Sequence, residues 1–139
     1  GVDRDVRRDH PYAAYGDFPV HVITQRNGDV FARFKMREKE MNVSEQLIMH
    51  FVGECLKGAK GLSVACEPKE GVGWSAVEAW RGEILTWVRL SKGRIDRCVV
   101  RDPSFCNWPL FGELAPGNIV PDFPLCNKSL NLSYSGTDL

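Results

Sequence analysis

The residues best suited to chemistry lie in a short charged interruption of an apolar stretch, residues 77–83. In this segment, Val-Glu-Ala-Trp-Arg-Gly-Glu, the charged pair Glu78 and Arg81 is followed by Gly82. One interpretation is a β-bulge, in which Gly82 supplies backbone freedom and the two charges form an ion pair. The other is an arginine that reaches into a cavity from a rigid strand end, where it would stabilise negative charge. The residues alone leave both interpretations open.

The histidines and the common short motifs give no further candidate. No histidine has a cysteine or a carboxylate at metal-ligand spacing, so we expect structural or surface roles for them. The sequence also lacks a nucleophile elbow, a phosphate-binding glycine loop and a dinucleotide fingerprint. The histidines are His10, His21 and His50.

Cysteine usage predicts a reducing compartment. The number of cysteines is odd and no two form a Cys-x-x-Cys pair, which argues against a zinc site or a disulfide framework. Each lies in an apolar neighbourhood, so we expect small buried side chains in a cytoplasmic protein. The cysteines are Cys55, Cys66, Cys98, Cys106 and Cys126.

Composition excludes several classes of protein. The 139 residues include 18 Lys plus Arg and 18 Asp plus Glu, so the formal net charge is zero and a nucleic-acid partner is not expected. Hydrophobic residues make up 43%, too many for a disordered chain. No apolar run is long enough for a transmembrane helix, and the charged first residues do not form a secretory signal. The length suits one domain.

A long helix over residues 29–57 is the clearest predicted element. Phe34, Met41, Ile48 and Cys55 follow one another at intervals of seven and form the centre of an apolar stripe. The opposite, polar face is expected to be solvated; it carries Arg33, Lys35, Arg37, Glu38, Lys39 and Glu40. Asn27-Gly28 could instead form a hairpin turn between strands at 20–24 and 30–34.

The rest of the chain changes period and predicts an α+β fold. Four short strands are expected, followed by short helices at 107–114 and 121–130 in a Pro-rich apolar tail and by a C-terminal coil. The long helix is expected to pack on the small antiparallel sheet. The strands are expected at residues 62–66, 74–80, 83–90 and 95–101.

The order of several short segments resembles a known family. The chain is similar to the C-terminal half of the large subunit of nickel–iron hydrogenases, especially the energy-converting, formate hydrogenlyase type, and to the quinone-side core subunit of respiratory complex I. Residues 77–83 resemble the family's Glu-Ala-Pro-Arg-Gly strand, with Trp80 where proline is commoner. The other matching segments are residues 5–8, 11–12, 18–20, 101–105 and 117–122.

The resemblance fails where hydrogenases bind nickel. Their last segment reads Asp-Pro-Cys-x-x-Cys, whereas this chain has Asn131, Leu132, Ser133 and Gly136 at the corresponding positions. A serine hydroxyl is hard and stays protonated, and glycine offers no ligand, so the resemblance implies a lost nickel site. Arg81 stands where the family places an arginine over the cavity, and Asp138 matches an acidic residue of the complex I branch.

The resemblance implies a role in an oxidoreductase complex. Residues 1–139 would be one fragment that supplies one wall of a cavity, with the missing N-terminal half supplying the other. Arg81, Asp122 and Asp138 would be the catalytic residues, and Glu78, Arg81 and Asn131 would line the cavity. The fragment would hold no cofactor and would be inactive alone, and a quinone is the expected acceptor in the complete protein.

Partners and location follow from the same resemblance. An iron–sulfur subunit would deliver electrons, and membrane-arm subunits would hold the complex at the cytoplasmic face of the cell membrane. The alternative is a non-catalytic scaffold that docks an iron–sulfur subunit onto a membrane arm. In isolation, the apolar stripe of the long helix could support a homodimer.

Overall fold

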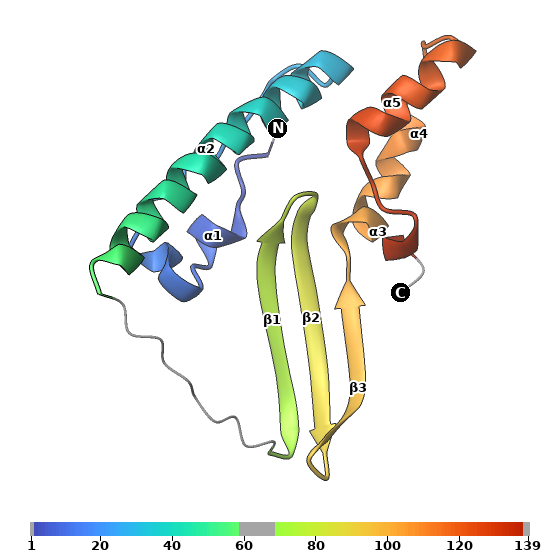
Figure 1. Cartoon of the computed structure of the whole chain (residues 1–139). Coiled ribbons are helices and arrows are strands. Elements are labelled where there is room, and N and C mark those ends of the chain that lie inside the picture. Colours follow the sequence, from blue (N-terminus) through green and yellow to red (C-terminus); the bar gives the residue numbers. More distant parts are fainter. Residues whose placement is uncertain (1, 59–68, 138–139) are drawn as a thin grey trace.

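Three antiparallel strands form a sheet in the order β1-β2-β3 (Figure 1). The computed structural model describes residues 2–58 and 69–137. The strands are β1 (Gly71–Ala79), β2 (Gly82–Ser91) and β3 (Arg94–Arg101). They confirm three of the four expected strands; the first, at 62–66, lies outside the described residues.

The charged interruption in the sequence is a hairpin turn. Ala79 pairs with Gly82 across β1 and β2, so Trp80 and Arg81 form a two-residue connection. Gly82 has a φ of +126°, a conformation that favours glycine. The bulge interpretation is therefore wrong, because the interruption is the end of the hairpin and the charged side chains bond to other partners. The turn places Arg81 at the rigid end of two paired strands.

The long helix is α2 (Val30–Leu56), which confirms the prediction for residues 29–57. Its first turn is capped by Asp29, whose carboxylate accepts a hydrogen bond from the Ala32 backbone N–H at 2.7 Å. The alternative hairpin at residues 27–28 is wrong, since the helix begins directly after this cap.

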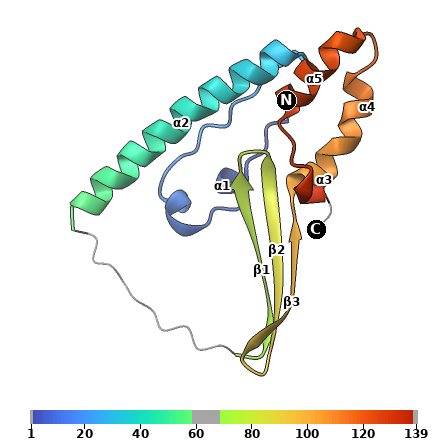
Figure 2. The same ribbon diagram turned by 45° about the vertical axis from the view of Figure 1, so that its right-hand side comes forward.

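The α+β class is confirmed, with one difference in arrangement. The first half of α2 packs against α5, and its second half holds the N-terminal segment through aromatic contacts. Phe51 makes edge-to-face contacts with Tyr15 and Phe18, at ring-centroid distances of 5.7 and 5.1 Å. In Figures 1 and 2, α1 (Val6–Asp9) lies between α2 and the end of the sheet. The long helix therefore lies over one end of the sheet, with other segments packed between the two.

Short helical segments follow the sheet. The chain turns into α3 directly after β3 because Asp102 caps the helix and Pro103 begins it, with the Asp102 carboxylate accepting from the Ser104 N–H at 2.7 Å. The tail ends in a short 3₁₀ turn at residues 135–137, where a coil was expected. The segments are α3 (Pro103–Asn107), η2 (Trp108–Leu110), α4 (Phe111–Leu114), η3 (Val120–Asp122), α5 (Phe123–Leu130) and η4 (Ser135–Thr137).

Much apolar surface is left uncovered, which corrects the expectation of buried cysteines. Cys126 is buried, but Cys55, Cys98 and Cys106 are exposed, because no other described element covers their faces of α2, β3 and α3. Cys66 lies outside the described residues. Seven large apolar side chains of α2 are also exposed: Phe31, Phe34, Met41, Ile48, Met49, Val52 and Leu56.

Candidate functional site

A cavity of about 950 Å³ lies where α2, α1, the β1–β2 hairpin and the end of α5 come together. Its walls are rich in charge: among the described residues they carry six arginines and four carboxylates, and no lysine. Apolar side chains such as Met36, Trp80 and Leu132 complete the lining. The charged residues are Arg4, Asp5, Arg7, Arg33, Arg37, Glu40, Glu78, Arg81, Glu83 and Arg101.

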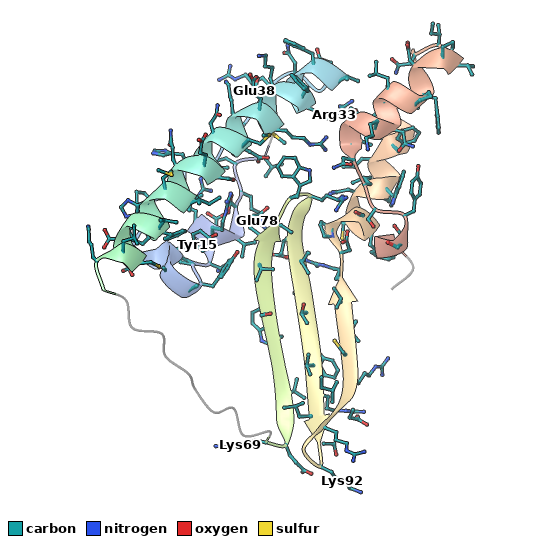
Figure 3. All side chains as sticks on the ribbon, in the orientation of Figure 1. Tyr15, Arg33, Glu38, Lys69, Glu78 and Lys92 are labelled. Carbon is teal, nitrogen blue, oxygen red and sulfur yellow. The ribbon has the colours of Figure 1, made fainter. Side chains whose placement is uncertain are left out.

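The hairpin turn presents Glu78 and Arg81 to this cavity. The Glu78 carboxylate accepts a hydrogen bond from the Val6 N–H at 2.9 Å, and its own backbone N–H donates to the Tyr12 hydroxyl at 3.3 Å. The Arg81 Nε donates to the backbone carbonyl of Asn131. These bonds join the hairpin to α1 on one side and to the end of α5 on the other. Figure 3 shows Glu78 at the end of β1 that faces α1.

One side of the cavity is basic and faces the C-terminal end of α5. The Arg33 Nε donates to the Ser129 hydroxyl at 2.9 Å, and the Arg37 Nη2 donates to the Leu130 carbonyl at 2.7 Å. Figure 3 shows Arg33 on the side of α2 that faces α5. These contacts are favourable because the C-terminal carbonyls of a helix carry partial negative charge. Burial, together with repulsion from Arg33 and Arg81, lowers the pKa of Arg37.

The opposite side is acidic and is built around Arg7. Arg7 forms a two-pronged ion pair with the buried Asp5, with Nε–Oδ1 and Nη2–Oδ2 distances of 3.0 and 2.6 Å. Glu40 and Glu78 complete this side. Burial raises the pKa of both glutamates, and the charge of Asp5 adds to the effect. These carboxyl groups therefore hold a proton more readily than exposed ones.

The residues at the positions that the resemblance assigns to nickel ligands lie behind the cavity wall. Ser133 and Gly136 do not line the cavity; the loop that carries them packs against α3. The Ser133 N–H donates to the buried Ser104 hydroxyl at 2.9 Å, and its carbonyl accepts from the Trp108 indole N–H at 3.1 Å. This loop is bonded to the fold through its backbone.

Neither position fits a nickel–iron group. The Ser133 hydroxyl accepts a hydrogen bond from the Gly136 N–H at 3.0 Å, so it is engaged inside its own turn. A Cβ atom at Gly136 would stand 2.6 Å from the Asp102 Cγ, which leaves no room for a side chain. Soft thiolates hold nickel, and this loop offers a hydroxyl and a hydrogen atom. Within residues 2–58 and 69–137, no group of three or more His, Cys, Asp or Glu side chains could hold a metal ion.

The structure brings only part of the predicted site together. Arg81 and Glu78 line the cavity, and Asn131 touches Arg81 through its backbone carbonyl. Asp122 is at the opposite end of α5 from Asn131. At 1.5 Å per helical residue, the two ends of this helix are about 12 Å apart. Asp138 lies outside the described residues.

Sequence analysis missed several cavity residues. The polar face of α2 was expected to be solvated, but Arg33, Arg37 and Glu40 line the cavity. Their spacing of four and three places them on one side of a helix, which is a signal that could have separated them from their exposed neighbours. Asp5 and Arg7 were also missed, because no residue pattern predicts that the N-terminal segment reaches β1.

Comparison with known proteins gives matches along the whole chain. A family described as "Respiratory-chain NADH dehydrogenase, 49 Kd subunit" matches residues 1–65. Hydrogenase-4 component G of Escherichia coli is 34% identical over 99% of this chain and 25% of its own length. Formate hydrogenlyase subunit 5 of Escherichia coli is 30% identical, over 99% of this chain and 24% of its own length. An NADH-quinone oxidoreductase subunit of Clostridium beijerinckii is 32% identical, over 88% and 34% respectively.

A solved structure has the same fold. A chain from the membrane-bound sulfane sulfur reductase, an archaeal respiratory membrane complex, superposes with a TM-score of 0.84 over 100% of this chain and 40% of that chain. At 24% sequence identity, this likeness shows the fold alone. The chain thus spans between about a quarter and two fifths of the length of the proteins that it matches. None of its described helices is both long and apolar enough to span a bilayer.

Proposed function

Because the chain belongs to the superfamily that contains the 49 kDa subunit of respiratory-chain NADH dehydrogenase and the large subunits of energy-converting hydrogenases, we propose that it is part of the large subunit of a membrane-associated oxidoreductase complex. In this proposal an iron–sulfur subunit and membrane-arm subunits are its partners, and the complex lies at the cytoplasmic face of the membrane. Residues 1–139 supply one wall of the redox cavity, and the remainder of the subunit supplies the other.

The observation that carries the proposal is the position of Arg81. Its guanidinium extends from the rigid end of the β1–β2 hairpin into a cavity that also contains Arg33 and Arg37. An electron acceptor that enters this cavity gains negative charge before protons reach it. A fixed guanidinium stabilises that charge without reorganisation, and its effect is larger in a partly buried site than in water.

We assign the electron acceptor to the quinone class and propose that the cavity holds no nickel centre. Supporting this choice, Ser133 and Gly136 do not fit nickel, whereas the cavity combines apolar walls with a few polar groups, as organic ligands require. Reduction of a quinone to a quinol consumes two electrons, which the iron–sulfur subunit would deliver, and two protons. Glu40 and Glu78 are the candidate proton donors on the cavity wall. Asp122, at the other end of α5, and Asp138, outside the described residues, stay predictions as proton carriers.

Metal analysis and acceptor binding in the complete complex test this proposal. We expect less than stoichiometric nickel, and a quinone analogue that changes the fluorescence of the cavity residue Trp80 in a saturable way. Trp80→Phe should remove that signal, and Trp74→Phe, on the distal part of β1, should leave it unchanged. One nickel per chain would contradict the loss of the metal site, and an analogue that does not bind would contradict the quinone assignment.

A scaffold without chemistry is the second candidate. The observation that favours it is the row of exposed apolar side chains on α2, which is larger than the isolated apolar residues of ordinary protein surfaces. In that case the subunit would dock an iron–sulfur subunit onto a membrane arm, and the charges of the cavity would serve assembly only.

A further inference from the structure

Three arginines of the cavity form no ion pair with a carboxylate among the described residues, and only Arg37 is partly offset by a more distant one, Glu40. Arg33, Arg37 and Arg81, which we call the arginine cluster, are all partly buried and converge on the end of α5. Among the described residues their hydrogen bonds run to neutral oxygen atoms only, namely backbone carbonyls and one hydroxyl. Within the same part of the chain, no carboxylate lies within ion-pair distance of them.

The other arginines of the same cavity are balanced. Arg7 pairs with Asp5, and both Arg4 and Arg101 pair with Glu83. The unbalanced charge is therefore a property of one side of the cavity and not of the whole wall. Arginine remains protonated in proteins, so a buried guanidinium needs a counter-charge or strong hydrogen bonds.

Hydrogen-bond donors of the arginine cluster remain free for a ligand. Among the described residues, the Nη1 and Nη2 groups of Arg81 make no hydrogen bond, and neither do Nε and Nη1 of Arg37 or Nη2 of Arg33. The Arg37 guanidinium also lies 5.9 Å from the centre of the Trp80 ring, which fixes its position on one face. Burial lowers the pKa of Arg37, with Glu40 opposing the shift and the like charges of Arg33 and Arg81 adding to it. Planar, pre-positioned guanidinium groups are the usual partners of carboxylate and phosphate groups.

We propose that the arginine cluster is a binding site for an oxyanion, a carboxylate or phosphate-type group on a small molecule that enters the cavity. The site shares the cavity of the proposed function, but recognition of a negative group does not require electron transfer. It adds a requirement for the ligand, since among the described residues only neutral oxygen atoms accept hydrogen bonds from these three guanidinium groups.

Equilibrium binding of simple anions to the complete protein tests the inference. The probes are inorganic phosphate and acetate, added at constant ionic strength in exchange for chloride and followed by calorimetry and by Trp80 fluorescence. We expect saturable binding that is at least about tenfold weaker in Arg37→Gln and in Arg81→Gln, since each removes a charge-assisted contact. The preferred probe distinguishes a phosphate-type from a carboxylate ligand.

Matched variants keep the test decisive. Arg101→Gln removes a charge from the same cavity but leaves Glu83 paired with Arg4, so anion binding should change less than about twofold. Arg37→Lys keeps the charge and loses the planar fork, so its anion affinity should be intermediate. This variant also serves as the test if Arg37→Gln fails to fold. Absence of saturable binding in the wild type, or equal weakening by Arg101→Gln and Arg37→Gln, would overturn the inference.

Turnover measured on the same preparations separates this inference from the proposed function. Anion binding without any redox activity would leave the oxyanion site standing and remove the oxidoreductase proposal. Redox activity without anion binding would leave the oxidoreductase proposal standing and overturn the oxyanion site.

Discussion

Gly136 lies so close to Asp102 that a Cβ atom at this position would stand 2.6 Å from the Asp102 Cγ and 2.9 Å from its Oδ1. Asp102 is not free to move away, because the same carboxylate caps α3 through the Ser104 N–H at 2.7 Å. The position that the resemblance assigns to a nickel cysteine therefore accepts glycine and disfavours every larger residue.

We expect Gly136→Ala to destabilise the protein by about 1–3 kcal/mol, the range for inserting a methyl group into a packed site. Urea unfolding measures the effect. Gly112→Ala is the control, because no atom lies within 4 Å of a Cβ built on this residue of α4, and alanine favours a helix. If both variants were equally stable, the close contact between Gly136 and Asp102 would have no energetic meaning.

Ser104 should be essential for holding the C-terminal loop. It is 0% exposed, and its hydroxyl accepts the Ser133 N–H at 2.9 Å. Ser104→Ala leaves that donor without its partner and should cost about 1–3 kcal/mol of unfolding free energy. Ser135→Ala, at an exposed residue of the same loop, should cost less than about 0.5 kcal/mol. An unchanged free energy of unfolding in Ser104→Ala would contradict this role of the hydroxyl.

Glu40 should make the stability depend on pH. Burial is the main cause that raises its folded pKa above the ordinary value of 4.5, with Asp5 and Glu78 raising it and Arg7 and Arg37 opposing the shift. Its contribution to stability is therefore fully present below about pH 4.5 and is lost as the pH rises through the folded pKa.

Glu40→Gln cannot ionise, so this variant should match the wild type at acidic pH and exceed its stability above the folded pKa. Urea unfolding from about pH 4 to about pH 8 measures the difference. Glu45→Gln, an exposed residue of the same helix, is the control and should follow the wild-type curve. A Glu40→Gln curve parallel to the wild type throughout would contradict a raised pKa in the folded state.

Local signals account for the parts of the fold that the sequence predicted well. The interval of seven apolar positions and the capping residue Asp29 are properties of neighbouring residues, and α2 has the expected bounds. The turn between β2 and β3 is local in the same way, because Gly93 suits a hairpin; it has a φ of +71° beside Lys92 at +51°.

Contacts between distant segments account for what was not predicted. The N-terminal segment reaches β1 through Val6 and Glu78, which are 72 residues apart, and no periodicity reports such a contact. Arg37 likewise bonds to Leu130, 93 residues away, so its face of the helix could not be separated from a solvated one by residue type alone. The exposure of Cys98 has the same origin, since burial depends on which element covers the sheet.

The turnover of Arg81→Ala, measured together with assembly of the complete complex, tests the central claim most directly. Arg81 is a donor on the cavity wall and its Nε also bonds to Asn131, so Arg81→Lys serves as the variant that keeps the charge. We predict that Arg81→Ala assembles but loses at least about 99% of turnover, in line with removal of one electrostatic stabiliser, and that Arg81→Lys keeps part of it. Unchanged turnover in an assembled Arg81→Ala complex would contradict the account and favour the scaffold.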